Sequence, residues 1–274
     1  MKINSEKSEM TFNLERLAET SNSLVLVTAA NMLIENSAVT IQPSKEVTEK
    51  LLSLLDALEE MPAINAFAIE GVRGSGKTTQ IGLLENGDFA VSGSRLITPL
   101  YTDFIQPQKK DVYMTMFGGE GRPTGSIIDS LIIAAFHADR LTRVQAISYN
   151  KPLLIDRHWL SFYAIERAKM IQSGLDAEIA ENIVAKIVTT WNQVNLTLVL
   201  HNVLVAVGEN RIIQRGEAVR SENEIQIETL VSETIELFCG GKSLIPKFNN
   251  TTKFFDAQKS AEVLHEEIKQ YFIK

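Results

Sequence analysis

Short runs of apolar residues alternate with amphipathic segments from about Ala66 to the end of the chain. Leu153, Leu154 and Ile155 form an unbroken apolar run, which is typical of a strand buried on both faces. The segments between such runs carry apolar residues every three or four positions, which predicts helices packed over a sheet. The fold class is therefore predicted to be α/β, a three-layer sandwich with a mostly parallel five-stranded sheet. Strands are expected at 66–70, 95–98, 151–156, 196–200 and 253–255, and helices at 127–147, 160–172, 177–191, 222–238 and 260–272.

The first 62 residues differ from the rest in pattern and charge. They hold 5 Lys+Arg and 10 Asp+Glu, so a net charge of −5 out of −7 for the whole chain lies here. Apolar residues at helical spacing predict a helix over 45–60, with Ser44 as its N-cap. The apolar, β-branched run Leu24–Val27 predicts a strand. We therefore expect an N-terminal extension, 1–62, followed by the main domain, 63–274.

Composition narrows the possible classes of protein. The chain has 274 residues, 45% hydrophobic and 22% charged, as in ordinary globular proteins, and no apolar run reaches the roughly 18 residues of a membrane helix. The acidic balance argues against nucleic acid as a partner. Cys239 is the single cysteine, so no intramolecular disulfide is possible, and no Cys/His cluster has zinc spacing. With acidic residues where a secretory signal would be basic and then apolar, a cytoplasmic protein is expected.

Residues 71–78 read Gly-Val-Arg-Gly-Ser-Gly-Lys-Thr and match the phosphate-binding loop G-x-x-x-x-G-K-[ST], or P-loop. Its glycines allow positive φ, so that successive backbone N–H groups point at a phosphate. Lys77 would reach the β- and γ-phosphate oxygens and the Thr78 hydroxyl would bind Mg²⁺. A glycine-rich turn with a chance lysine is the alternative, but a strand precedes the loop and a helix follows, as the motif requires. ATP and Mg²⁺ are the predicted cofactors, and the loop residues expected to bind ATP are Gly71, Arg73, Gly74, Ser75, Gly76, Lys77, Thr78 and Thr79.

Residues 67–80 resemble the opening of thymidylate kinases, within the nucleoside and nucleotide monophosphate kinase group. Glu70 before the first glycine and Thr78-Thr79-Gln80 after the lysine carry this resemblance beyond the bare loop. Three further blocks follow in the family's order: a helix ending in Asp139-Arg140, a strand ending in Asp156-Arg157-His158, and the strand 196–200 with an arginine-bearing segment at about 208–222. The resemblance covers about residues 64–274 and implies a P-loop NTPase fold, an ATP donor and a nucleotide acceptor.

The resemblance also implies roles for single residues. Asp156, at the carboxyl end of a strand, would hold Mg²⁺ with Thr78, and Arg157 would neutralise phosphate charge. The segment 208–222 would form a lid over ATP. Each assignment has a structural alternative, such as a helix-capping Asp, a solvated arginine or a core histidine. Catalytic roles are predicted for Lys77, Asp156, Arg157 and Arg220, ATP contacts for Arg211 and Arg215, and acceptor contacts for Arg73, Arg122, Arg140, Arg157 and His158.

The sequence departs from thymidylate kinases on the acceptor side. Arg73 stands where that family carries an acid facing the acceptor sugar, His158 replaces a tyrosine, and Val219-Arg220 replaces Asp-Arg. The predicted function is ATP-dependent phosphorylation of a (deoxy)nucleoside monophosphate, with dTMP or a related pyrimidine deoxynucleotide as the first candidate. A deoxynucleoside or hydroxymethyl-base kinase and a non-catalytic ATP-binding regulatory module are the alternatives. A homodimer is compatible with the sequence.

Overall fold

The fold is taken from a computed structural model of the chain, which divides into two compact units. A helical unit contains residues 1–61, 100–144 and 169–191, and a sheet unit contains residues 62–99, 145–168 and 192–274. The residues that the structure describes are 20–36, 43–85, 95–96, 126–147, 152–214, 216, 221–241 and 245–272.

The sheet unit is built on a four-stranded, all-parallel sheet in the order β3-β1-β4-β5. β2, which is only two residues long, adds a parallel edge strand next to β3. The expected α/β fold with a parallel sheet is confirmed. The register pairs Ile69 with Asp156 and Gly71 with Leu200, so the carboxyl ends of β1, β3 and β4 meet at one edge. The strands are β1 (Ala66–Gly71), β2 (Arg95–Leu96), β3 (Leu153–Asp156), β4 (Leu196–His201) and β5 (Thr252–Asp256).

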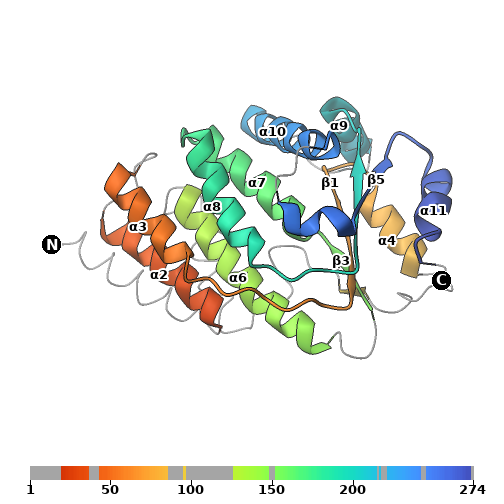
Figure 1. The fold of residues 1–274 in the computed structure, drawn as a ribbon. Helices are drawn as coiled ribbons and strands as arrows, with labels where there is room; N and C mark the ends of the chain where they lie inside the picture. The colour runs from red at the N-terminus through yellow and green to blue at the C-terminus, as the bar shows by residue number, and fades with distance from the viewer. Residues whose placement is uncertain are drawn as a thin grey trace. The chain divides into compact units, whose positions relative to one another are not determined.

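Helices cover both faces of this sheet. Consecutive residues of a strand point to opposite faces, and in β5 Phe254 contacts Phe238 of α10 whereas Phe255 contacts Tyr271 just beyond α11. α4 packs against β1, β3 and α11, so α4 and α11 share one face (Figure 1). On the other face the rings of Trp159 and Phe248 stack beside α10. The elements are α4 (Lys77–Glu85), α9 (Val205–Gln214), α10 (Glu222–Cys239), the 3₁₀ helix η1 (Pro246–Thr251), α11 (Ala261–Lys269) and, up to residue 168, α7 (Trp159–Gln172).

The helical unit contains α2 (Ser21–Glu35), α3 (Lys45–Leu55), α8 (Ala177–Thr189) and most of α6 (Ser126–Ile147) (Figure 1). α3 packs on both α2 and α8, and the ring of His137 lies 5.1 Å from that of Trp191, between the centroids. No helix among the described residues has the length and apolar character needed to cross a bilayer.

The strand predicted at Leu24–Val27 is wrong, because these residues lie inside α2. The apolar run continues to Ile34 with buried residues at helical spacing, and Thr20 and Ser23 form a capping box at its start. The helix predicted over 45–60 also ends early, at Leu55. The chain leaves the helix because Glu59 exchanges two backbone hydrogen bonds with the Asn22 side chain, of 2.7 and 2.8 Å.

Candidate active site

The P-loop connects β1 to α4 and takes a conformation that its glycines make possible. Gly71, Gly74 and Gly76 have φ of 139°, 77° and 92°. A Cβ on Gly71 would lie 2.3 Å from the Leu200 carbonyl oxygen, and one on Gly74 would lie 2.6 Å from the Gly208 Cα. Side chains at these two positions are therefore excluded both by φ and by space.

The Lys77 ammonium group is buried inside the loop. Its Nζ donates hydrogen bonds to the carbonyl oxygens of Gly71, at 2.9 Å, and Val72, at 2.7 Å. Burial and, to a lesser extent, the nearby positive charge of Arg157 lower the pKa of Lys77 to about 7. An anion bound in the loop would oppose both effects and favour the charged form.

Glu70, the residue before the first glycine, caps α7. Its buried carboxylate accepts hydrogen bonds from the backbone N–H groups of His158 (2.8 Å), Leu160 (3.0 Å) and Ser161 (3.2 Å), and from the Ser161 hydroxyl. Burial raises the pKa of Glu70, and these hydrogen bonds oppose that rise. The carboxylate thus fixes the start of α7 to the end of β1.

This attachment positions Arg157 over the P-loop. Arg157 lies between β3 and α7 in the left-handed region, with φ of 67°, which costs a non-glycine residue about 1 kcal/mol. Its backbone N–H donates to the Ile69 carbonyl at 3.0 Å, and its Nη1 lies 3.4 Å from the Gly71 carbonyl oxygen and 3.2 Å from Ser161 Oγ. The guanidinium is therefore directed at the loop by local backbone geometry.

Asp156 and Thr78 fit the Mg²⁺ ion that a P-loop implies. Asp156 follows the buried part of β3, and its Oδ1 is buried without a hydrogen-bond partner among the described residues. An unsatisfied buried carboxylate oxygen is costly unless a ligand reaches it, and oxygen atoms are what Mg²⁺ prefers. Thr78 is exposed in the second position of α4 and lines a cavity above the P-loop.

α9 and α10 hold the P-loop from outside. Arg211 Nη1 donates to the Gly74 carbonyl at 3.0 Å, and the backbone N–H of Arg73 donates to Glu228 Oε1 at 2.7 Å. A Cβ on Gly208 would lie 2.8 Å from the Arg73 carbonyl oxygen, so α9 and the loop are in backbone contact.

A cavity of 710 Å³ opens above the P-loop, wholly within the sheet unit. It extends to the turn between β5 and α11, residues 257–260. Its described lining contains five basic side chains and no acidic one. The basic residues are Arg73, Lys77, Arg157, Arg211 and Lys259.

The structure brings most of the predicted donor-site residues together. The lining includes residues 73–79 of the loop with Arg157 and Arg211, while Gly71 and Asp156 lie next to it in the strands. His158 is buried, with its ring 6.4 Å from that of Phe248, and does not line the cavity. Arg140 lies on α6 in the helical unit, buried with its Nη1 3.3 Å from His137 Nδ1. Arg122, Arg215 and Arg220 lie outside the described residues, and of the predicted lid only 208–214, the end of α9, and 216 and 221–222 are described.

Sequence reasoning missed three contributions to this site. Glu228 holds the P-loop from α10, Gln214 lines the cavity from α9, and residues 257–261 line its far end. The contribution of residues 257–261 could have been anticipated. Ligands of parallel α/β sheets bind at the carboxyl ends of the strands, and β5 ends at Asp256. Glu228 lies in an ordinary acidic helix face and carries no such signal.

The parallel α/β sheet with a P-loop after β1 is a kinase-like P-loop fold, and comparisons with known proteins agree. No protein-family model and no curated protein matches the sequence. Among solved structures, a thymidylate kinase from Candida albicans has a TM-score of 0.56 and 18% identity over 76% of this chain and 91% of that chain. A deoxyadenosine kinase from M. mycoides, with dCMP and dCDP bound, has a TM-score of 0.50 and 14% identity over 77% and 98%. The same enzyme with dATP bound has a TM-score of 0.51 and 14% identity over 76% and 100%.

At these identities the likeness shows the fold. The chain has the fold of the P-loop deoxynucleotide and nucleoside kinases.

Proposed function

We propose that this protein transfers the γ-phosphoryl group of ATP to a (deoxy)nucleoside monophosphate, with dTMP or a related pyrimidine deoxynucleotide as the acceptor. The observation that carries the proposal is the cavity above the P-loop, whose described lining has five basic and no acidic side chains. Such a surface suits a polyphosphate and repels a cationic ligand. The kinase fold of the neighbouring structures supports phosphoryl transfer as the reaction.

The chain's own residues would act by positioning and charge neutralisation. The backbone N–H groups of the loop and Lys77 would bind the β- and γ-phosphates, with Lys77 leaving the Gly71 and Val72 carbonyls. Arg157 would approach from the turn between β3 and α7, and Arg211 from α9. Thr78 and Asp156 would hold Mg²⁺, which when bound neutralises charge on the β- and γ-oxygens. Because the phosphates lie at the loop, the adenosine end of ATP would extend toward residues 257–261.

The choice of acceptor depends on whether a general base is available. A sugar hydroxyl must lose a proton as it attacks, whereas a phosphate monoester is already largely ionised at pH 7. Glu70 is engaged by three backbone N–H groups and a hydroxyl, and the described cavity lining has no carboxylate. This favours a monophosphate acceptor.

A deoxynucleoside is the second candidate acceptor. The observation in its favour is that the likeness to the deoxyadenosine kinase structures spans 98% and 100% of those chains. In that case a carboxylate from outside the described cavity lining would have to act as the general base.

A panel of acceptors tests both proposals. With Mg²⁺ and ATP, we expect ADP release to depend on a deoxynucleoside monophosphate, and Lys77→Ala to lower the rate about 10²–10³-fold because one charge contact of the transition state is lost. The variant also controls for contaminating kinases. Turnover with deoxynucleosides alone would establish the second candidate instead, and tight ATP binding with no active acceptor would indicate a regulatory nucleotide-binding module.

A further inference from the structure

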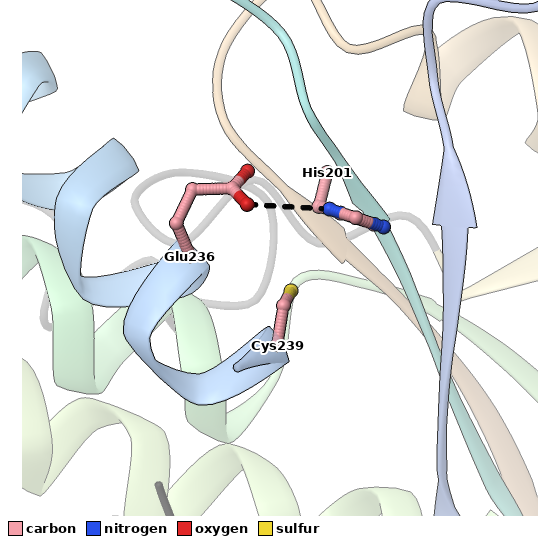
Figure 2. Close-up of side chains that lie close together, drawn as sticks. All are labelled: His201, Glu236 and Cys239. Atoms are coloured by element: carbon pink, nitrogen blue, oxygen red, sulfur yellow. Dashed lines mark hydrogen bonds and ion pairs between the residues drawn. The ribbon is translucent and has the colours of Figure 1, made fainter. Parts of the chain in front are cut away.

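Three side chains capable of binding a transition metal meet on the sheet unit, away from the P-loop cavity lining. His201 ends β4, and Glu236 and Cys239 lie one turn apart near the end of α10. One ligand atom from each residue lies within 4.8 Å of those of the other two (Figure 2). The side chains of His201 and Glu236 are 22% and 45% exposed, so an ion could reach them from solvent.

The donor set has a recognisable chemistry. A thiolate, an imidazole and a carboxylate together suit zinc, which accepts three protein ligands with water in the fourth position. Tetrahedral zinc needs donor atoms roughly 3.5 Å apart, given its bond lengths of about 2.0 to 2.3 Å. His201 Nδ1 and Glu236 Oε2 are already 3.4 Å apart. Small side-chain rotations would bring Cys239 to the same ion.

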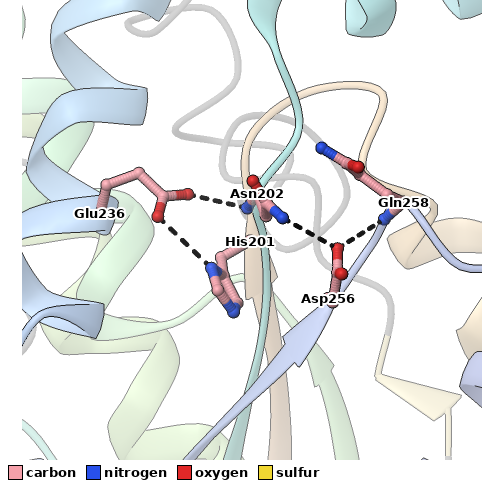
Figure 3. Close-up of polar contacts among 5 residues, drawn as sticks. All are labelled: His201, Asn202, Glu236, Asp256 and Gln258. Atoms are coloured by element: carbon pink, nitrogen blue, oxygen red, sulfur yellow. Dashed lines mark hydrogen bonds and ion pairs between the residues drawn. The ribbon is translucent and has the colours of Figure 1, made fainter.

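Neighbouring residues hold the carboxylate in place. Glu236 Oε1 accepts the backbone N–H of Asn202 at 2.7 Å, and Asn202 Nδ2 donates to Asp256 Oδ1 at 3.2 Å (Figure 3). Asp256 Oδ1 also accepts the backbone N–H of Gln258 at 3.0 Å. Outer contacts of this kind orient metal ligands.

Zinc binds cysteine as the thiolate, so an ion that binds the Cys239 sulfur displaces the thiol proton to solvent.

We propose that His201, Glu236 and Cys239 form a site for a zinc ion that joins the end of β4 to the end of α10. Both elements also hold the P-loop: Leu200 of β4 lies against Gly71, and Glu228 of α10 binds the Arg73 N–H. The ion would thus brace the scaffold of the nucleotide site without entering it. This inference does not depend on which acceptor the protein uses.

Cobalt(II) gives a direct test, because Cys239 is the single cysteine of the chain. We titrate the full-length protein with Co²⁺ in a non-thiol reductant, expecting one equivalent to give a near-ultraviolet sulfur-to-cobalt charge-transfer band and the strong visible bands of four-coordinate cobalt. Added Zn²⁺ should displace the cobalt and abolish both.

Variants assign the ligands. Cys239→Ser should abolish the charge-transfer band. His201→Gln and Glu236→Gln should each weaken cobalt binding more than about tenfold, because even the loss of a contact outside the ligand set costs about 10–100-fold in metal affinity. The matched control is Glu233→Gln, an exposed carboxylate one turn earlier on α10, which should bind cobalt as wild type does. An unchanged far-ultraviolet circular dichroism spectrum would show that each variant is folded.

Two results would overturn the proposal. One is the absence of a charge-transfer band at micromolar cobalt in the wild-type protein. The other is cobalt binding that Cys239→Ser and His201→Gln leave unchanged. In either case the three residues form only a hydrogen-bonded junction between β4 and α10.

Discussion

At the residue scale, Lys77 is positioned by hydrogen bonds of its side chain, whereas Arg157 is positioned by the conformation of its backbone. Lys77 is buried and held by two carbonyl oxygens of its own loop. Arg157 is directed by a left-handed backbone that the Glu70 cap holds in place, 86 residues along the chain from the glycine it contacts. Both cations approach the same carbonyl oxygen, that of Gly71, and each therefore gains from an anion bound between them.

The lowered pKa of Lys77 predicts that nucleotide binding takes up a proton. In the free protein the pKa is about 7, so at pH 8 about nine in ten Lys77 side chains are neutral, and bound phosphates raise the pKa and recharge them. Binding of Mg²⁺ with a non-hydrolysable ATP analogue at pH 8 should take up close to one proton, and affinity should fall as pH rises above 7. Calorimetry in buffers of different ionisation enthalpy measures this uptake.

Lys77→Arg is the control, because a guanidinium keeps its charge throughout this range. The variant should bind without proton uptake. If it takes up the same proton as wild type, another group titrates on binding.

We expect the Asp156→Asn variant to lose metal-dependent activity. Asp156→Asn removes the negative charge from a buried oxygen that has no hydrogen-bond partner among the described residues. The neutral amide binds Mg²⁺ and its waters poorly, so turnover should fall at millimolar Mg²⁺ while affinity for metal-free ATP changes little. Turnover measured over a Mg²⁺ series checks this; wild-type activity throughout would make Asp156 a structural residue.

At the element scale, α9 is packed backbone to backbone against the P-loop. Gly208 of α9 and Gly74 of the loop approach so closely that a Cβ on either would clash with the other element. The position of the loop is therefore set by how α9 follows β4.

Gly208→Ala should displace the loop. Its Cβ would lie 2.8 Å from the Arg73 carbonyl oxygen, and overpacking of this kind costs about 1–3 kcal/mol. We expect a lower Tm and weaker ATP binding, measured by thermal unfolding and calorimetry. Gly82→Ala, in α4 with nothing within 4 Å of the added Cβ, is the matched control and should be neutral or stabilising by up to about 1 kcal/mol. Equal behaviour of the two variants would contradict the close contact.

At the scale of the whole molecule, the described parts of the N-terminal segment, residues 20–36 and 43–61, belong to a folded unit. α2 buries six apolar side chains, and Asn22 and Ser21 bond to Glu59 after α3. An ion pair joins Asp56 to Lys186 of α8. The buried apolar residues of α2 are Leu26, Val27, Ala29, Ala30, Leu33 and Ile34.

A pair of leucines on α2 tests this. Leu33 is 1% exposed and Leu24 is 55% exposed. Leu33→Ala should lower the free energy of unfolding by about 2–5 kcal/mol, whereas Leu24→Ala should change it by less than about 0.5 kcal/mol. Urea denaturation followed by circular dichroism provides the comparison, and equal small effects would mean that α2 does not belong to a core.

The sequence by itself determined the α/β class, the P-loop, and the strands and most helices of the sheet unit. These features are local: a glycine spacing, a strand before it, a lysine and threonine after it, and apolar periodicity over ten or so residues. The helix α9 was not predicted. Leu24–Val27 was mistaken for a strand because a run of four apolar residues fits either structure, and the capping box that decides for the helix lies before it.

Only the tertiary structure decided which polar residues meet. Glu70 and His158 are 88 positions apart, Arg73 and Glu228 155, and His201 and Glu236 35. Each contact depends on which strands are neighbours in the sheet and on how α7 and α10 pack against it, and neither leaves a pattern along the chain. For this reason the spacing of Cys and His in the sequence showed no zinc site, while the packing of α10 beside β4 brings together three side chains of the types that bind metal ions.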